Sequence, residues 1–279
     1  MSTAQPAQPD DEPRSGFDVT TPNTARVYDF WLGGKDNFAA DRAEAERLTG
    51  LCPQLPRLAQ ENRNFLFRAV AWLAGQDVRQ FLDVGSGLPT AHNTHQAAQA
   101  VDPSCRVVYA DNDPVVVGHA TALLTGEAVA AVEADLASPA ALPGHPAVAR
   151  LILPGEPTAL ILALVLHFFT AEAVEKIMAE LTGWLAPGSY LVMSVGSGDQ
   201  RTGGTLAREY RPAVLRNHPP DQVAAFLDGL DLVPPGLVDA RDWAPGAAAP
   251  EQRKHEGGRI LAAVGRKPCM PAGQAGRRM

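Results

Sequence analysis

The positions of apolar and polar residues divide the chain into a helical first part and an alternating second part. Between residues 21 and 73, apolar side chains recur every three or four positions, which is the spacing of amphipathic helices. This spacing predicts three helices, over residues 24–32, 37–49 and 57–73. Gly33 and Gly34 separate the first two, because adjacent glycines interrupt a helical pattern.

Short apolar runs alternate with helical stretches in the second part. Seven runs have the character of buried strands: 80–84, 106–111, 128–133, 158–164, 189–195, 230–233 and 259–266. Helical stretches over 92–100, 114–124 and 171–185 lie between the earlier runs. Such alternation produces a mostly parallel sheet with helices on both faces. We therefore expect an α/β, Rossmann-like fold with a seven-stranded sheet whose last strand returns antiparallel after a proline- and glycine-rich connection.

These patterns also predict the division of the chain. Residues 1–19 are rich in Pro, Gln, Asp and Ser, which predicts a disordered tail. Residues 20–76 form a helical extension or lid, and residues 77–267 form the nucleotide-binding domain. Residues 268–279 are expected to be a second tail.

Charge and composition narrow the compartment and the partners. The chain of 279 residues has a net charge of −7, which disfavours sequence-independent binding to nucleic acid. No apolar run reaches the length of about 18 residues that a membrane helix needs, and the polar, acidic start is unlike a signal peptide. Cys52, Cys105 and Cys269 show neither disulfide nor metal-ligand spacing. We expect a cytoplasmic monomer or homodimer with no metal, no nucleic-acid partner and no membrane contact.

The most informative motif follows the first expected strand. Asp83 precedes Gly85, Ser86 and Gly87, and a second strand ends on Asp111 about 24 residues later, as in a β-α-β nucleotide-binding unit. The glycines let the backbone approach a ligand, and the second acid can accept the hydroxyls of a ribose. A tight turn without a ligand would explain the glycines but not both acids.

The loop departs from the dinucleotide pattern Gly-x-Gly-x-x-Gly. Thr90 stands at the third glycine position, and Pro89 precedes it. Such a loop does not need to hold a pyrophosphate, so it suits a nucleoside without phosphates. S-adenosylmethionine is the commonest cofactor of that kind, whereas an NAD-dependent dehydrogenase is disfavoured.

Residues at two further strand ends can face the same ligand. Asp135 can accept a hydrogen bond from an adenine amino group with Leu136 against the ring; a helix cap or a solvated acid is the alternative. His167 follows the fourth strand and can be a general base, a neighbour of the cofactor or a structural histidine. Tyr28, in the first helix, is the second candidate base.

Five segments together resemble one family. They are residues 25–42, with the run Gly-Gly-Lys-Asp-Asn-Phe, and residues 82–96, 107–114, 166–168 and 185–192. Over residues 20–267 the chain resembles the actinobacterial S-adenosylmethionine-dependent methyltransferase-like proteins, long catalogued as a domain of unknown function. The run Gly-Gly-Lys-Asp-Asn-Phe is the specific signature of that family.

The resemblance implies a class I methyltransferase fold that binds S-adenosyl-L-methionine. The positions that it and the strand ends assign to the cofactor are Tyr28, Gly33, Lys35, Asp83, Gly85, Ser86, Gly87, Asn93, Asp111, Asn112, Asp135, Leu136, Leu164 and His167. Among these, Tyr28, Gly33 and Lys35 would belong to a lid, and Asp83 would line the methionine part.

We expect an enzyme that methylates a small molecule, such as a secondary metabolite. Methyl transfer from a sulfonium is an in-line displacement, for which the protein mainly supplies alignment. His167 and Tyr28 are the candidate bases for an acceptor that has to lose a proton early. Two alternatives keep the cofactor: reaction at another carbon of the sulfonium, and a non-catalytic module that only binds it.

Two segments bear on the substrate. Residues 196–204 form a glycine-rich turn after the fifth expected strand, where a substrate would approach. Arg208, Tyr210 and Arg211 can meet an acidic substrate, although a solvated helix face is the favoured interpretation.

Overall fold

The computed structural model describes residues 18–90, 93–123, 126–199, 201–248 and 257–269, in which one mixed sheet organises the chain. The strand order is β3-β2-β1-β4-β5-β8-β6, and β7 also pairs with β8. The strands are β1 (Gln80–Val84), β2 (Arg106–Asp111), β3 (Val129–Glu133), β4 (Thr158–Ala163), β5 (Tyr190–Gly198), β6 (Asp231–Leu232), β7 (Val238–Asp239) and β8 (Gly258–Arg266).

The first five strands are parallel, and the sheet finishes with antiparallel pairs. Strand β1 pairs with β2 on one side and with β4 on the other. Strands β2 and β3 therefore extend the sheet in one direction from β1, and β4 and β5 extend it in the other. Strand β8 inserts antiparallel between β5 and the short strands β6 and β7. The expected α/β, Rossmann-like class I fold is confirmed. Ligands of such sheets bind at the carboxyl ends of the strands, where the order reverses.

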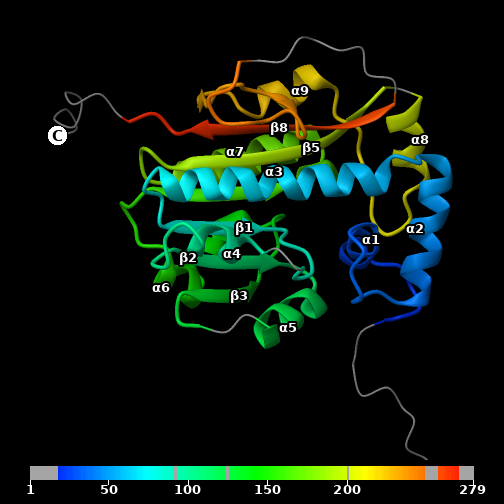
Figure 1. Cartoon of the computed structure of the whole chain (residues 1–279), viewed down its shortest axis with the longest axis horizontal. Helices are drawn as coiled ribbons and strands as arrows, with labels where there is room; N and C mark the ends of the chain where they lie inside the picture. Colours follow the sequence, from blue (N-terminus) through cyan, green and yellow to red (C-terminus); the bar gives the residue numbers. More distant parts are fainter. Residues whose placement is uncertain (1–17, 91–92, 124–125, 200, 249–256, 270–279) are drawn as a thin grey trace, which may run out of the picture.

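Helices precede the sheet and connect its strands (Figure 1). The α-helices are α1 (Thr24–Trp31), α2 (Ala39–Leu51), α3 (Leu55–Gly75), α4 (Thr94–Gln99), α5 (Pro114–Leu123), α6 (Pro146–Leu151), α7 (Ala171–Trp184), α8 (Thr202–Glu209) and α9 (Pro220–Ala225). The 3₁₀ segments are η1 (Pro139–Gly144) and η2 (Leu166–Phe168).

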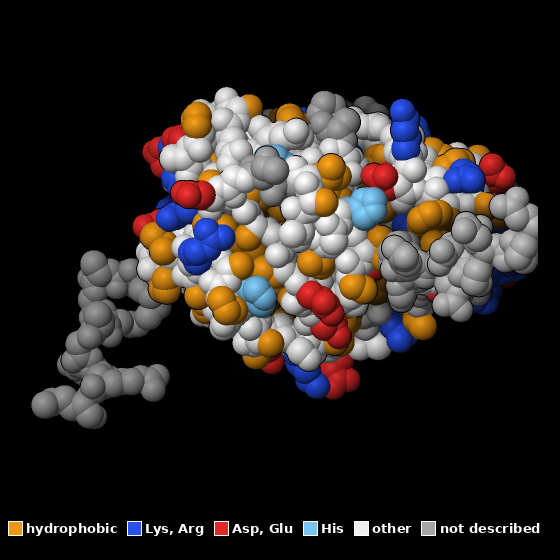
Figure 2. All heavy atoms as spheres, turned by 90° about the horizontal axis from the view of Figure 1, so that it is seen from below, with side chains coloured by type: hydrophobic (Ala, Val, Ile, Leu, Met, Phe, Trp, Pro, Cys, Tyr) orange, Lys and Arg blue, Asp and Glu red, His pale blue; other side chains and the backbone are white. Residues whose placement is uncertain are grey.

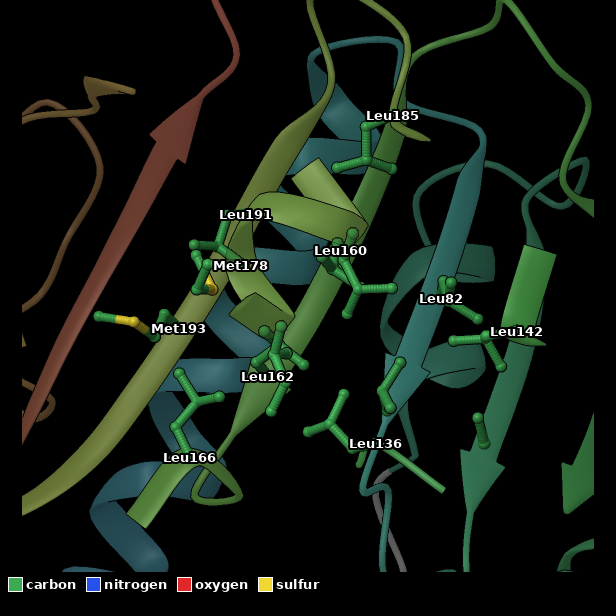
Figure 3. Close-up of a cluster of buried hydrophobic side chains, with 14 of the residues drawn as sticks. Leu82, Leu136, Leu142, Leu160, Leu162, Leu166, Met178, Leu185, Leu191 and Met193 are labelled. Atoms are coloured by element: carbon green, nitrogen blue, oxygen red, sulfur yellow. The ribbon is translucent and has the colours of Figure 1, made fainter. Parts of the chain in front are cut away.

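Alternate strand residues build two cores on opposite faces of the sheet. Phe81 of β1 packs with Phe65 and Leu73 of α3, which runs along one face in Figure 1. Its neighbour Leu82 points to the other face and packs in the core that contains Leu181 of α7. Figure 3 shows leucines of β1, β4 and β5 together in this second core. The alternation of side chains along each strand therefore determines which residues pack against α3 and which pack against α7.

A third, smaller core joins α1 and α2 to the α8 region. Val27, Leu48 and Leu55 are buried in it, and Leu206 and Tyr210 pack against them. Helices α1 and α2 therefore cover one end of the sheet rather than either face, as Figure 1 shows.

The structure differs from the sequence-based expectation in three respects. The expected edge strand over 230–233 corresponds to the short β6, and an unexpected eighth strand, β7, follows the prolines and glycine at 234–236 and also pairs with β8. Helices α6, α8 and α9 were not predicted, and glycines within residues 196–204 hid α8. The expected tails lie almost entirely outside the described residues. The boundaries of the other helices and strands shift by a few residues.

Candidate functional site

The carboxyl ends of β1 to β5, together with α1 and α3, surround a cavity of about 480 Å³. It brings together most of the residues singled out in the sequence. Those that line it are Tyr28, Asp83, Gly85, Ser86, Gly87, Asp111, Asn112, Asp135, Leu136, Leu164 and His167. Gly33, Lys35 and Asn93 do not line it.

The glycine loop needs both glycines, each for a different reason. Gly85 has φ +70°, and a Cβ there would lie 2.6 Å from Val165 Cγ2. Gly87 has φ +65°, and no atom lies within 4 Å of the position a Cβ would take. Gly85 therefore allows close packing of the loop against the β4 exit. Gly87 leaves open space on the side of the cavity, where a ligand can contact the backbone.

Asp111 is fixed by the loop that it faces. Its Oδ2 accepts a hydrogen bond from the Gly87 backbone N–H at 2.9 Å, and its Oδ1 accepts one from the Asp113 N–H at 3.0 Å. A carboxylate has about four acceptor positions, so about two remain for hydroxyl groups in the cavity. Burial raises the pKa of Asp111, and the hydrogen bond from Gly87 opposes that shift.

Asp83 and Arg63 place opposite charges at the inner end of the cavity. Asp83 is buried, and its Oδ2 accepts a hydrogen bond from Thr94 Oγ1 at 2.6 Å. Burial raises the pKa of Asp83 to about 6, and both that hydrogen bond and the nearby Arg63 charge oppose the rise. The Arg63 guanidinium donates to Thr90 Oγ1 at 2.7 Å, but its buried Nε has no partner among the described residues. This pair is complementary to the ammonium and carboxylate of an amino-acid group.

The end of β3 contributes one polar and one apolar side chain. The Asp135 carboxylate is exposed and accepts the Ala137 N–H at 2.8 Å, which is the cap-like contact considered as its alternative role. Leu136 is buried beside it. Both line the cavity, so the cap leaves Asp135 able to accept a further hydrogen bond from a ligand.

The exit of β4 is strained and apolar. Leu164 adopts φ +54°, a left-handed conformation that costs a leucine about 1–3 kcal/mol. Ser194 of β5 holds it, because the Leu164 N–H donates to both the backbone oxygen and the Oγ of Ser194. His167 follows, and burial lowers its pKa to about 3, so the imidazole is neutral at pH 7. Its Nδ1 is buried and has no partner among the described residues.

Tyr28 belongs to a buried chain of hydrogen bonds. Ser194 Oγ donates to Asn62 Oδ1 at 2.6 Å, and Asn62 Nδ2 donates to the Tyr28 hydroxyl at 3.0 Å. The Tyr28 hydroxyl donates in turn to the backbone oxygen of Ala59 at 3.1 Å. Burial raises the pKa of Tyr28. Its hydroxyl is therefore engaged on both sides and connects α1 to the middle of the sheet.

The Gly-Gly-Lys-Asp-Asn-Phe signature folds around a buried aspartate instead of the cavity. The Asp29 carboxylate accepts hydrogen bonds from the Asp36 N–H at 3.0 Å and from Asn37 Nδ2 at 2.8 Å. A Cβ at Gly34 would lie 1.9 Å from Asp29 Oδ1, so only glycine fits there. Lys35 is exposed. The signature is therefore a local structure that closes the turn between α1 and α2.

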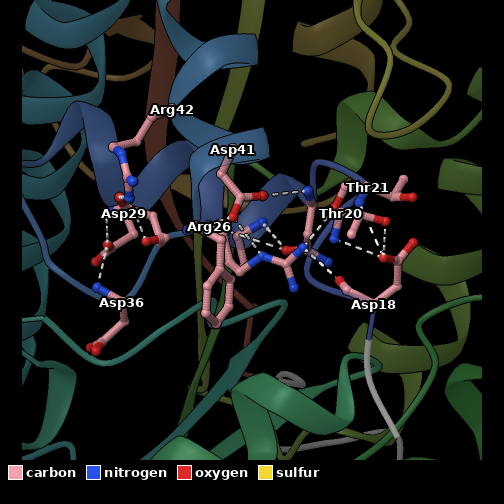
Figure 4. Close-up of polar contacts among 12 residues, drawn as sticks. Asp18, Thr20, Thr21, Arg26, Asp29, Asp36, Asp41 and Arg42 are labelled. Carbon is pink, nitrogen blue, oxygen red and sulfur yellow. Dashed lines mark hydrogen bonds and ion pairs between the residues drawn. The ribbon is translucent and has the colours of Figure 1, made fainter. Parts of the chain in front are cut away.

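A second carboxylate fastens the start of α1. The buried Asp41 accepts hydrogen bonds from the Asn23 N–H, Arg26 Nε and the Phe38 N–H at 2.8–2.9 Å. Arg26 also donates to the backbone oxygens of Asp18 and Thr21, as Figure 4 illustrates. These contacts hold the segment before α1 beside the cavity.

Asn93 has a local role too. Its side chain accepts from the Thr90 N–H and donates to the Thr90 carbonyl, both at 2.9 Å, and it precedes α4 as the cap residue. These contacts shape the loop that ends at Thr90, whose hydroxyl meets Arg63. Asn93 therefore supports the site indirectly.

Several lining residues were not identified from the sequence. Asn62 and Arg63 lie on α3 between Leu58 and Phe65, so they interrupt its apolar face. A polar pair on the buried side of a helix is the signal that points to them. Asp113 was also missed; it directly precedes α5, and its Oδ2 accepts a hydrogen bond from Asn23 Nδ2 at 2.6 Å.

The glycine-rich segment after β5 has a packing role. A Cβ at Gly203 would lie 2.5 Å from Asn217 Oδ1, and one at Gly198 would lie 2.9 Å from the Gly203 nitrogen. The Asn217 amide pairs with the Gly198 backbone in both directions, at 3.0 and 3.1 Å. The glycines therefore let α8 and the segment around Asn217 close over the end of β5. Tyr210 lines the cavity, whereas Arg208 and Arg211 do not.

The outer surface carries mixed charge. Figure 2 shows acidic and basic side chains interspersed among apolar and uncharged ones on the face in view. Within the described residues, no helix combines the length and apolar character needed to cross a membrane.

Comparison with known proteins adds independent evidence. Residues 10–268 match the family described as S-adenosyl methyltransferase. A crystal structure of a candidate methyltransferase from Thermobifida fusca YX is similar, with a TM-score of 0.82 and 38% identity over 92% of this chain and 99% of that chain. The crystal structure of a DUF574 family protein from Streptomyces avermitilis MA-4680 is also similar. Its TM-score is 0.80 and its sequence identity is 37%, over 90% of this chain and 99% of that chain. No curated protein matches the sequence.

Proposed function

Because the chain belongs to the S-adenosyl methyltransferase family and is therefore an S-adenosylmethionine-dependent methyltransferase, we propose that its acceptor is a small organic molecule. The cavity of about 480 Å³ carries this proposal, since the reaction requires cofactor and acceptor to meet in one enclosed space. Small-molecule sites measure about 300–1,000 Å³, and the volume of this cavity lies within that range. A secondary metabolite is an acceptor of that kind.

The residues around the cavity fit the cofactor. Asp111 has acceptor positions left for the ribose hydroxyls, and the open space at Gly87 admits the ligand to the backbone. Asp135 and Leu136 supply an acceptor and an apolar surface for the adenine. Asp83 with Arg63 matches the charges of the methionine part. We propose these residues as the cofactor site.

Alignment is the main task left to the protein. The cofactor supplies a methyl group on a positively charged sulfur, which is already electrophilic. Correct positioning of the acceptor can contribute about 7–11 kcal/mol in favourable cases. His167 is neutral at pH 7 and lies in the cavity, so it can accept a hydrogen bond from the acceptor, whereas its low pKa of about 3 makes it a weak base for proton transfer. The Tyr28 hydroxyl is already engaged, so we propose a positioning role for it in place of a catalytic one.

Helices α1 and α2 are proposed to act as a lid. They contact the rest of the chain through a small core that includes Leu206 and Tyr210, and Asn23 reaches Asp113 beside the cofactor loop. A cover of this size can exclude water from the sulfonium. Gly33 and Lys35 would serve the lid through the turn around Asp29 rather than through contact with the cofactor.

Calorimetric titration tests the cofactor site. Wild-type protein is expected to bind S-adenosylmethionine and not NAD, and Asp111→Ala is expected to weaken binding by at least about tenfold, or 1.4 kcal/mol. An unchanged dissociation constant would remove Asp111 from the site. Product analysis with candidate acceptors tests the reaction, because S-adenosylhomocysteine forms only with methyl transfer. Turnover of a small molecule supports the proposal, whereas activity confined to protein or nucleic acid contradicts it.

A further inference from the structure

We propose that the acceptor is an apolar molecule that carries a carboxylate, and that Arg216 binds this carboxylate. The inference rests on the proposed small-molecule function and adds the chemical class of the substrate. It is carried by the distribution of charge along the cavity, by the fixed position of Arg216 and by the apolar walls between Arg216 and the cofactor residues.

The acidic lining residues of the cavity all lie at one end, together with Arg63, whereas the charged residues that line the other end are basic. All of its acidic lining residues, namely Asp83, Asp111, Asp113 and Asp135, come from the ends of β1, β2 and β3. The lining beyond them, formed by α8, residues 210–217 and the start of β8, contains no acid among the described residues and two arginines. In a chain with a net charge of −7, this end is locally positive and favours an anion.

Of the two arginines, only Arg216 is available. Arg259 faces Asp239, with its Nη1 3.7 Å from Asp239 Oδ1. The side chain of Arg216 is exposed, and its guanidinium makes no hydrogen bond or ion pair with another described residue. A guanidinium presents a planar set of donors that matches a carboxylate in a bidentate arrangement.

The backbone holds Arg216 in place. Its N–H donates to the carbonyl oxygen of His167 at 2.8 Å, and the neighbouring Asn217 is paired with Gly198 in both directions. The guanidinium therefore projects from a fixed segment that also contacts the β4 exit. A carboxylate bound there would orient the rest of the molecule towards His167.

The walls of this section predict the body of the acceptor. They are formed mainly by large apolar side chains from five elements: Trp31, Leu55, Leu58, Phe168, Leu206 and Ile260. Two of the nearby polar side chains are already committed, since Ser197 Oγ donates to the His218 carbonyl at 3.0 Å and the Asn217 amide pairs with the Gly198 backbone. An aromatic or aliphatic body is therefore preferred over a sugar or a peptide, which would leave polar groups unpaired.

This inference is tested by comparing the affinities of two compounds that differ only in a carboxylate and a neutral amide. Protein saturated with S-adenosylhomocysteine is titrated with 2-naphthoate and with its neutral counterpart 2-naphthamide. Naphthoate is expected to bind at least about fivefold more tightly, which corresponds to about 1 kcal/mol. Arg216→Gln is expected to reduce this preference to less than about twofold, and Arg216→Lys to retain part of it. Arg208→Gln, an exposed arginine of α8 outside the cavity, is the control and should keep the full preference.

The outcomes separate this inference from the function on which it rests. Unchanged affinity of Arg216→Gln for S-adenosylhomocysteine shows that the variant is folded. Equal binding of the two compounds, no binding of naphthoate, or a preference that survives Arg216→Gln would each overturn the carboxylate proposal while cofactor binding stands. Failure of the wild-type protein to bind S-adenosylhomocysteine would instead contradict the proposed function itself.

Discussion

The buried carboxylate of Asp83 leads to the most quantitative prediction. This side chain is fully enclosed at the inner end of the cavity and has one neutral hydrogen-bond donor, Thr94. Its pKa rises from 3.8 to about 6 because burial penalises the charged form. Ionised Asp83 therefore destabilises the fold at neutral pH in the absence of a ligand. Replacement by asparagine removes the charge and keeps the size and one acceptor.

The size of the effect follows from linkage. The contribution of Asp83 to stability is fully present below pH 3.8 and is lost as the pH rises through about 6, because the folded state holds the proton more tightly. At roughly 1.4 kcal/mol for each pKa unit, the loss is about 2 kcal/mol at pH 5 and about 3 kcal/mol at pH 8. The free energy of unfolding of Asp83→Asn, relative to wild type, should thus rise by about 1 kcal/mol between these pH values.

Urea unfolding of both proteins at pH 5 and pH 8, without cofactor, measures this difference. The comparison uses the change with pH, because the new amide can lack partners and lower the free energy of unfolding by about 1–3 kcal/mol at every pH. Thr94→Val provides the matched control. It removes the donor to the Asp83 carboxylate, so it should steepen the pH dependence in the wild-type background and leave it unchanged in Asp83→Asn.

A pH-independent difference between Asp83→Asn and wild type would refute the reasoning, since it would mean that Asp83 keeps an ordinary pKa and is hydrated in the folded protein. The same variant should bind S-adenosylmethionine more weakly at pH 8. A relative gain in stability at the higher pH, together with a loss of affinity for the cofactor, is the behaviour expected of a charged group that serves binding.

Three further substitutions test the framework of the site. Gly85→Ala should lower the free energy of unfolding, measured in urea, by about 2 kcal/mol or more. Residue 85 has a positive φ, and the new Cβ would lie 2.6 Å from a methyl group of Val165. A stability equal to that of wild type would contradict this loop geometry. Asn62→Leu should cost about 2–3 kcal/mol by the same measurement, since it removes the donor to the Tyr28 hydroxyl and the acceptor for the buried Ser194 hydroxyl; a neutral effect would mean that the chain of hydrogen bonds is absent. Asp41→Asn leaves the Arg26 guanidinium buried without a carboxylate, which costs about 3 kcal/mol. The segment before α1 should then be cleaved faster by a protease. An unchanged rate of cleavage would show that the Arg26–Asp41 ion pair does not hold this segment.

Local sequence determined the parts of this protein that depend on backbone chemistry. The alternation of apolar runs predicted the parallel strands, because a strand buried on both faces requires continuous apolar residues. The glycines at 85 and 87 predicted a loop whose backbone a ligand can approach closely, and the structure gives both a positive φ. Residues that end neighbouring parallel strands, such as Asp111 and Asp135, necessarily lie at one edge of the sheet. Their meeting in one cavity was therefore predictable without any knowledge of helix packing.

Tertiary structure alone decided the rest, because the groups concerned meet only when distant segments pack. Asn62 and Ser194 are 132 residues apart and form one hydrogen bond, and no local pattern records that pairing. The signature residues Gly33 and Lys35 were expected at the cofactor. Their turn instead packs around the carboxylate of Asp29, and neither residue lines the cavity. The position of Arg216 beside the acceptor space likewise depends on a contact with His167, 49 residues earlier, that only the folded chain provides.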